Sequence, residues 1–239
     1  MNMERKKYVI FTAGGSGTRM GGATPKQFLM LDGVPVLQRS ISVFKEACPD
    51  VNIVTVLPEA HIGTWKSLCA ETSFNYPQIL VKGGITRFHS VKNALAVIPD
   101  GALVAVHDGV RPMISPELVS RMFARMASCR ALIPVLPMVD TLKSLVRNSS
   151  GELVPSGLPD PDRSRVYGAQ TPQMFLSEEL KAAYERPFDT SFTDDASVAA
   201  KSGIPLSFIE GERGNIKITT PEDMRAAESM LLLGRLGKG

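Results

Sequence analysis

The 239-residue chain is 44% hydrophobic and 21% charged with a net charge of +3, a composition that suits one soluble α/β domain. Its cations form no basic stripe and no apolar run approaches the roughly 20 residues that span a bilayer, so neither nucleic acid nor a membrane is an expected partner. With no secretory signal, and with Cys48, Cys69 and Cys129 too scattered for a zinc site or a disulfide framework, the chain is predicted to be cytoplasmic and to bind small anions.

A glycine-rich loop follows the first predicted strand, Tyr8 to Phe11. Three glycines lie within residues 14 to 17, and two cations, Arg19 and Lys26, come after them. Glycine lets a backbone approach a ligand closely, successive N–H groups in such a loop form a concave anion site, and cations neutralise phosphate oxygens. The loop therefore predicts a polyphosphate site with two catalytic cations.

Two common nucleotide motifs do not fit this loop. The dinucleotide fingerprint G-x-G-x-x-G has Met20 where its third glycine belongs, and the acidic residue expected at a following strand end is missing. A P-loop needs Lys and Ser or Thr where Ala23 and Thr24 stand. An ordinary glycine-rich turn with solvated cations stays an alternative at this point.

Helices and strands then alternate along the chain. Apolar residues at helical spacing predict helices over residues 36–47, 59–73, 90–98 and 116–128. Runs rich in β-branched residues predict strands over 51–57, 78–81, 102–106 and 131–136. This alternation predicts a doubly wound, mostly parallel Rossmann-like sheet.

Two further loops are candidates for ligand binding. Lys82 to Ser90 contains two glycines and opens a helix, so its N–H groups can face a nucleotide, although a tight loop with an N-cap explains the same residues equally well. Asp108 follows a buried strand at the sheet edge where open α/β sheets bind ligands, and a carboxylate beside phosphates commonly holds Mg²⁺. We favour that role for Asp108 over the capping of a turn, and we expect His107 to be an ordinary loop histidine.

The alternation stops at Met138. Residues 139–166 are predicted to form a β-hairpin arm that protrudes from a single domain spanning residues 1–239. An arm that cannot bury its apolar face alone usually packs on another chain, so we expect a homodimer, with a mobile surface insertion as the alternative.

The remaining elements return to the domain. Residues 167–175 are predicted as a strand followed by a turn, 206–209 and 215–219 as strands, and 177–185, a segment starting at Thr193 or Asp194, and 224–232 as helices. Lys217 interrupts the last apolar run, and by default it faces solvent.

Six ordered blocks resemble the 2-C-methyl-D-erythritol 4-phosphate cytidylyltransferases of the non-mevalonate isoprenoid pathway. They are AGGSGTRMG…PKQF at 13–28, GGxxRxxSV at 83–91, HDxxRP at 107–112, AQTPQ at 169–173, FTDDAS at 192–197 and NIKITTPED at 215–223. The resemblance implies that the 4-phosphate of the substrate attacks the α-phosphorus of CTP and displaces pyrophosphate. It also implies a homodimer and a divalent cation, Mg²⁺.

The same resemblance implies a role for individual residues. Three cations are implied to be catalytic: Arg19, Lys26 and Lys217. Six residues are implied to contact the nucleotide: Ala13, Gly14, Gly15, Gly84, Ser90 and Asp108. Four are implied to contact the acceptor: Arg111, Arg163, Thr193 and Asp194. Asp108 is in addition the residue implied to lie near Mg²⁺. Arg163 is chosen over Arg165 by counting back from Thr171, and the resemblance implies that it reaches into the site of the partner subunit.

Two other functions stay open. A ribitol 5-phosphate cytidylyltransferase would share the phosphate loop and differ in its polyol phosphate, and FTDDAS together with Arg163 favours methylerythritol phosphate over it. A non-catalytic nucleotide-binding scaffold need not retain Arg19, Lys26, Asp108 and Lys217, all of which are present.

Overall fold

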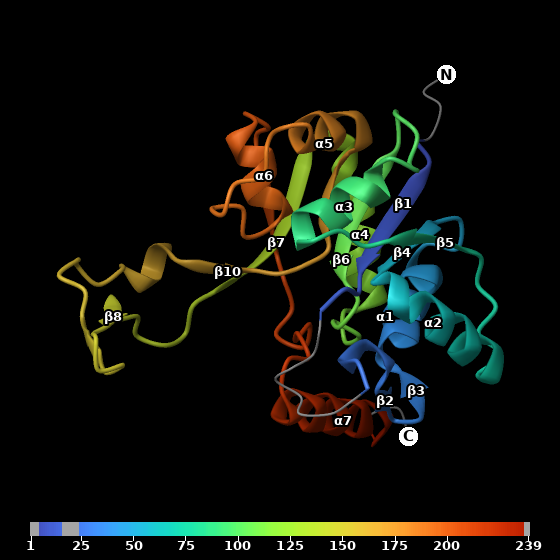
Figure 1. Ribbon diagram of the computed structural model, residues 1–239, viewed down its shortest axis with the longest axis horizontal. Helices are drawn as coiled ribbons and strands as arrows, with labels where there is room; N and C mark the ends of the chain where they lie inside the picture. Colours follow the sequence, from blue (N-terminus) through green and yellow to red (C-terminus); the bar gives the residue numbers. More distant parts are fainter. Residues whose placement is uncertain (1–4, 16–23, 237–239) are drawn as a thin grey trace.

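The computed structural model describes residues 5–15 and 24–236 (Figure 1). An eight-stranded sheet forms its centre, with the order β10-β7-β11-β6-β1-β4-β5 and with β12 paired to β7. The strands are β1 Lys7–Thr12, β4 Asn52–Leu57, β5 Gln78–Lys82, β6 Leu103–Asp108, β7 Ala131–Pro137, β10 Tyr167–Ala169, β11 Gln173–Leu176 and β12 Ser207–Glu210. Neighbouring strands run parallel except where β10 and β11 join, so the predicted mostly parallel sheet is confirmed.

Helices cover both faces of this sheet, because side chains of a strand alternate between its two faces. In β1, Tyr8 and Ile10 belong to one buried cluster, which α3, α5 and α6 complete. Val9 and Phe11 belong to the other, with α1, α2 and α4. The helices are α1 Val36–Ala47, α2 Glu59–Glu71, α3 Arg87–Leu95, α4 Pro116–Arg125, α5 Ser177–Tyr184, α6 Asp195–Lys201 and α7 Pro221–Leu236.

The order of the strands places a crevice at the end of β1. The chain adds β4 and β5 on one side of β1 and then crosses over to add β6 on the other. Thr12 and Asp108, the last residues of β1 and β6, are direct neighbours in the register. Ligands of open α/β sheets bind at the carboxyl ends of strands where the order reverses, so a site is expected here.

A smaller cluster lies below this edge and holds the C-terminal helix. Ala227 of α7 packs with Leu31, Val36, Val110 and Ile218. Short elements feed into this region: β2 Met30–Leu31 and β3 Val34–Pro35 pair with each other, and the 3₁₀ turn η2 spans Lys26–Phe28. The cluster therefore ties the C-terminal helix to the loop that follows β6.

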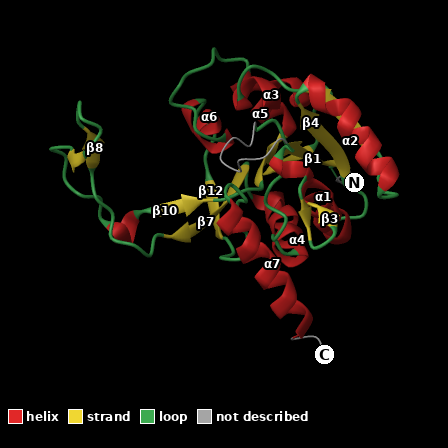
Figure 2. Ribbon diagram, turned by 60° about the horizontal axis from the view of Figure 1, so that its bottom comes forward, coloured by secondary structure: helices red, strands yellow, loops and turns green. Residues whose placement is uncertain are grey.

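The arm protrudes from the body, as Figures 1 and 2 show. Its hairpin consists of β8 Leu145–Arg147 and β9 Leu153–Pro155, which are antiparallel, and the 3₁₀ turn η4 Arg163–Arg165 leads back to β10. Apolar side chains stay exposed along it: Val139, Leu145, Val146, Leu153 and Leu158. The predicted hairpin is confirmed, while its role in dimerisation stays a prediction.

Two predicted strands differ from those observed. Residues 215–219 form no strand. Ile218 is buried and Ile216 partly buried in the cluster that includes α7, and only Ile218 donates a backbone hydrogen bond to the strand-end loop, at the carbonyl of Val110 (2.9 Å). The segment 167–175 is two strands, β10 and β11, separated by a turn with a cis peptide between Thr171 and Pro172.

Within the described ranges, no helix is long and apolar enough to cross a membrane.

Candidate active site

A cavity of about 520 Å³ opens at the crevice between β1 and β6. Residues from six separate stretches of the chain line it, and they bring eight of the predicted site residues together: Ala13, Gly14, Gly15, Lys26, Gly84, Ser90, Asp108 and Lys217. Arg19, the remaining predicted cation of the first loop, lies outside the described residues.

Asp108 is the charged centre of the cavity. Its carboxylate lies 3.0 Å from Nζ of Lys217, 3.2 Å from Nε of Arg111 and 4.0 Å from Nε of Arg87. Burial alone raises the pKa of this carboxyl, but the charges of Lys217, Arg87 and Arg111 outweigh it and hold the pKa well below its usual range. Asp108 is therefore ionised, and the surrounding positive charge favours a second anion nearby.

Lys26 also lines the cavity, next to the glycine loop. Pro25 precedes the 3₁₀ turn that carries Lys26, and Gln27 donates a hydrogen bond from Nε2 to the carbonyl of Ala13 (2.8 Å). This bond fastens the turn to the end of β1. Cε of Lys26 lies 3.8 Å from the point where a side chain on Gly15 would begin, so its aliphatic chain passes directly beside the loop.

The second glycine loop has a shape that requires its glycine. A Cβ on Gly84 would lie 2.4 Å from Cβ of His89 and 2.9 Å from its carbonyl carbon. The N–H of Gly84 donates to Oγ of Ser90 (3.0 Å), which itself donates to the carbonyl of Thr86 (2.9 Å). Ser90 therefore shapes the loop and Thr86 caps α3, as the explanation by a tight loop with an N-cap requires, while nucleotide binding by the loop stays a prediction.

Lys217 reaches Asp108 because its segment is tied to the loop after β6. Arg111 donates from Nη1 to the carbonyl of Asn215 (2.7 Å), and Asn215 donates from Nδ2 to the carbonyl of Thr171 (2.8 Å). The expectation that Lys217 merely faces solvent is wrong: its side chain is 43% exposed, but its ammonium group pairs with Asp108. The segment packs from the side rather than joining the sheet, which is why strand periodicity misplaced it.

His107 belongs to the support of the site, which the sequence did not reveal. It is completely buried beside Phe11 and Phe44, and Oγ1 of Thr171 lies 3.1 Å from its Nδ1. The carbonyl of Arg111 can only accept, so Nε2–H of His107 donates to it (3.1 Å), and Nδ1 of the neutral ring accepts the hydroxyl proton of Thr171, whose Oγ1 in turn accepts the N–H of Asp108 (3.0 Å). Burial lowers the pKa of His107 to about 4, so the ring is neutral.

None of the four predicted acceptor residues lines the cavity of its own chain. Arg111 comes nearest, through its contact with Asp108, which does line the cavity. Asp194 caps α6 by accepting the N–H of Ser197 (2.8 Å), and it also accepts a hydrogen bond from Gln173 (2.8 Å). Thr193 precedes it and is exposed. Arg163 lies in the arm, where it donates to the carbonyl of Val139 (2.7 Å), and it does not line the cavity.

A metal ion would need help from a ligand in this cavity. The described residues contain no cluster of three or more His, Cys, Asp or Glu side chains that could hold one. Asp108 supplies one carboxylate, and Mg²⁺ is usually held by one or two carboxylates together with substrate phosphates and water. The residues present therefore fit a metal that arrives with a phosphate ligand.

Comparisons with known proteins agree with this geometry. A model of the 2-C-methyl-D-erythritol 4-phosphate cytidylyltransferase family matches residues 8–232. The protein of that name from Bacteroides fragilis is 42% identical to this chain, over 93% of this chain and 98% of its own length. The one from Porphyromonas gingivalis is 43% identical, over 96% of this chain and 99% of its own length.

Solved structures share the fold. The 4-diphosphocytidyl-2C-methyl-D-erythritol synthase of Anaerococcus prevotii superposes with a TM-score of 0.76 at 27% identity, covering 95% of this chain and 99% of that one. The 2-C-methyl-D-erythritol 4-phosphate cytidylyltransferase of Thermus thermophilus gives a TM-score of 0.70 at 27% identity, covering 95% and 98%. With a family model and relatives that both span nearly its whole length, the chain belongs to the 2-C-methyl-D-erythritol 4-phosphate cytidylyltransferase family.

Proposed function

We propose that this protein transfers CMP from CTP to 2-C-methyl-D-erythritol 4-phosphate and releases pyrophosphate, a step of non-mevalonate isoprenoid precursor biosynthesis. The observation that carries the proposal is the cavity itself, where two glycine loops, Lys26, Lys217 and Asp108 meet at the end of β1. Backbone N–H groups and cations on its walls suit a triphosphate, and its volume of about 520 Å³ suits a small molecule.

The reaction needs little covalent chemistry from the protein. A phosphate oxygen of the acceptor forms a bond to the α-phosphorus of CTP, and the bond from that phosphorus to the oxygen bridging to the β-phosphorus breaks, so pyrophosphate leaves. Positioning and charge stabilisation dominate such transfers. We assign these tasks to Lys26 and Lys217, which both line the cavity, and to Arg19 of the first loop.

Several nucleotide contacts follow from the same placement. The backbone of Ala13, Gly14 and Gly15 lies beside Lys26 and would hold the phosphates, while Gly84 and the loop shaped by Ser90 would hold the base. Asp108 would bind Mg²⁺ together with phosphate oxygens, and the ion would neutralise charge on the triphosphate.

We propose the acceptor site to be shared between two chains. Arg111, Thr193 and Asp194 would contribute from one subunit and Arg163 from the arm of its partner, in a cytoplasmic homodimer of single-domain subunits whose arm is residues 139–166. The exposed apolar side chains of the arm support this arrangement, since they need a surface to cover them. Leu153→Asp is expected to give monomers in sedimentation velocity, whereas Ser150→Asp at the hairpin tip is expected to leave the dimer intact.

The test of the function is pyrophosphate release from CTP with Mg²⁺ and one acceptor at a time. Release is expected with 2-C-methyl-D-erythritol 4-phosphate at a kcat/KM at least about tenfold above that with ribitol 5-phosphate, as for a site that hydrogen-bonds its substrate's hydroxyl groups. The opposite preference would assign the protein to ribitol phosphate. CTP binding in calorimetry with no release for either acceptor would point to a scaffold.

A further inference from the structure

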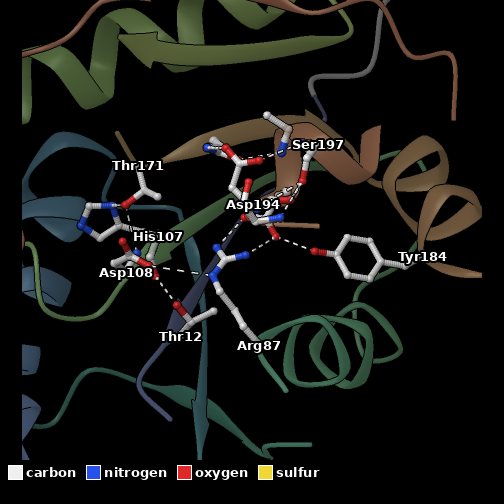
Figure 3. Close-up of polar contacts among 12 residues, drawn as sticks. Thr12, Arg87, His107, Asp108, Thr171, Tyr184, Asp194 and Ser197 are labelled. Atoms are coloured by element: carbon white, nitrogen blue, oxygen red, sulfur yellow. Dashed lines mark hydrogen bonds and ion pairs between the residues drawn. The ribbon is translucent and has the colours of Figure 1, made fainter. Parts of the chain in front are cut away.

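Arg87, which lines the cavity and is partly exposed, forms an ion pair with the buried Asp195 that the reaction itself does not explain (Figure 3). Arg87, the first residue of α3, donates from Nη1 and Nη2 to the two carboxylate oxygens of Asp195, at 3.0 and 2.5 Å. Tyr184 of α5 donates its hydroxyl to Oδ1 of the same carboxylate (2.6 Å). We call these three residues the bridge.

Asp195 is not needed as the cap of its own helix. Its side chain is completely buried, and a buried carboxylate is costly unless it is paired and hydrogen-bonded. The helix α6 is already capped by its neighbour Asp194, which accepts the N–H of Ser197. The carboxylate of Asp195 therefore acts on Arg87 and Tyr184 rather than on its own helix.

The bridge joins two parts of the chain that the proposed function assigns to different substrates. Arg87 follows directly on the glycine loop that includes Gly84, and its Nε lies 4.0 Å from Asp108. Asp195 follows directly on Thr193 and Asp194, the predicted acceptor residues. With both Nη atoms held by Asp195, the guanidinium can turn neither away from Asp108 nor away from α6.

We propose that Arg87 and Asp195 are positioning residues that couple acceptor binding to nucleotide binding. The two hydrogen bonds between Arg87 and Asp195 hold the nucleotide loop at a fixed distance from the start of α6. A nucleotide that orders this loop therefore also orders the acceptor site. The inference rests on the proposed function for the identity of the two ligands. Tyr184 supports the pair by keeping the Asp195 carboxylate in the orientation in which both of its oxygens face the Arg87 guanidinium.

The coupling is measured by calorimetry on the full-length protein. The dissociation constant of 2-C-methyl-D-erythritol 4-phosphate is determined alone and with a saturating CTP analogue that carries a methylene group between the α- and β-phosphorus and so cannot react. We expect the analogue to lower this constant at least about fivefold in the unaltered protein, the lower end of typical couplings between sites, and less than about twofold in Asp195→Asn.

The matched control is Lys92→Gln, which removes another ion pair from the same helix. Nζ of Lys92 lies 3.2 Å from Glu185 on the surface, away from the cavity. This variant is expected to keep the full coupling. Arg87→Lys retains the charge but not the two-pronged contact, so it is expected to lose the coupling, and it decides the question where Asp195→Asn does not fold.

A second measurement needs no reaction. In Asp195→Asn or Arg87→Lys, amide hydrogen exchange is expected to be about tenfold faster both at residues 84–90 and at 193–197, and unchanged in Lys92→Gln. Wild-type coupling and exchange in a folded Arg87→Lys variant would overturn the proposal, as would turnover by an unaltered protein that shows no coupling. If the protein neither binds CTP nor releases pyrophosphate, the proposed function fails, and the exchange pattern alone then decides whether the bridge links the two segments.

Discussion

The stability of the protein is expected to fall between pH 7 and pH 5 because of one buried histidine. His107 has a pKa of about 4 in the folded protein against 6.5 for an ordinary histidine. In this interval the unfolded chain therefore binds a proton that the folded chain excludes. When folding lowers the pKa of a base, its contribution to the free energy of unfolding is fully present above the pKa of the unfolded chain. This contribution is lost as the pH falls towards the pKa of the folded protein.

The size of the effect follows from the two pKa values. Each pKa unit corresponds to about 1.4 kcal/mol, so the free energy of unfolding should drop by about 2 kcal/mol at pH 5 and about 3 kcal/mol at pH 4. Asp108 does not contribute to the upper part of this window, since the pKa of its carboxyl lies below pH 5 in both states: 3.8 is its ordinary value, and the folded value is lower still. The interval from pH 7 to pH 5 therefore isolates His107 from that neighbour.

Urea unfolding followed by the fluorescence of Trp65 measures the change, because this tryptophan is the only one in the chain and is buried. The matched variant is His107→Asn, whose amide oxygen can still accept a hydrogen bond from Thr171 but cannot be protonated. This variant is expected to be less stable at pH 7. Its free energy of unfolding is expected to fall between pH 7 and pH 5 by at most about half as much as that of the unaltered protein. An equally steep loss of stability in this variant would refute the reasoning.

Other expectations concern the cavity and one helix. Lys26→Ala is expected to lower kcat by a factor on the order of 10² to 10³ in the pyrophosphate assay, as for loss of a preorganised charge. Gly84→Ala is expected to raise KM for CTP at least about tenfold, because the added Cβ would collide with His89 and force the loop open. Gly63→Ala, in the exposed interior of α2 where a Cβ meets nothing within 4 Å, is expected to stabilise the protein by about 0.5–1 kcal/mol in urea unfolding.

Each of these expectations has an outcome that contradicts it. Near-normal turnover of Lys26→Ala would remove this lysine from the reaction. An unchanged KM in Gly84→Ala would mean that the second loop does not hold the nucleotide, and Gly63→Ala, where the added Cβ has free space outside the cavity lining, serves as its steric comparison. A destabilised Gly63→Ala would show that α2 is not the regular helix described.

The sequence predicted the layered fold because the relevant information is local. Alternation in β1 sends Tyr8 and Ile10 to one face and Val9 and Phe11 to the other, and each flanking helix carries its own apolar stripe. Asp108 was found by the same means, since its place at a strand end is visible in the order of elements. The hairpin arm was predicted from two short strands around a turn.

Only the tertiary structure decided which of these residues act together. The pairs Arg87–Asp195 and Asp108–Lys217 join residues more than a hundred positions apart, and no periodicity along the chain records such a contact. Residues 215–219 alternate like a strand, yet they pack on α7 because burial of Ile216 and Ile218 does not require a sheet. Local patterns determine how each segment buries its apolar side; the partners of a buried charge depend on where folding places the other segments.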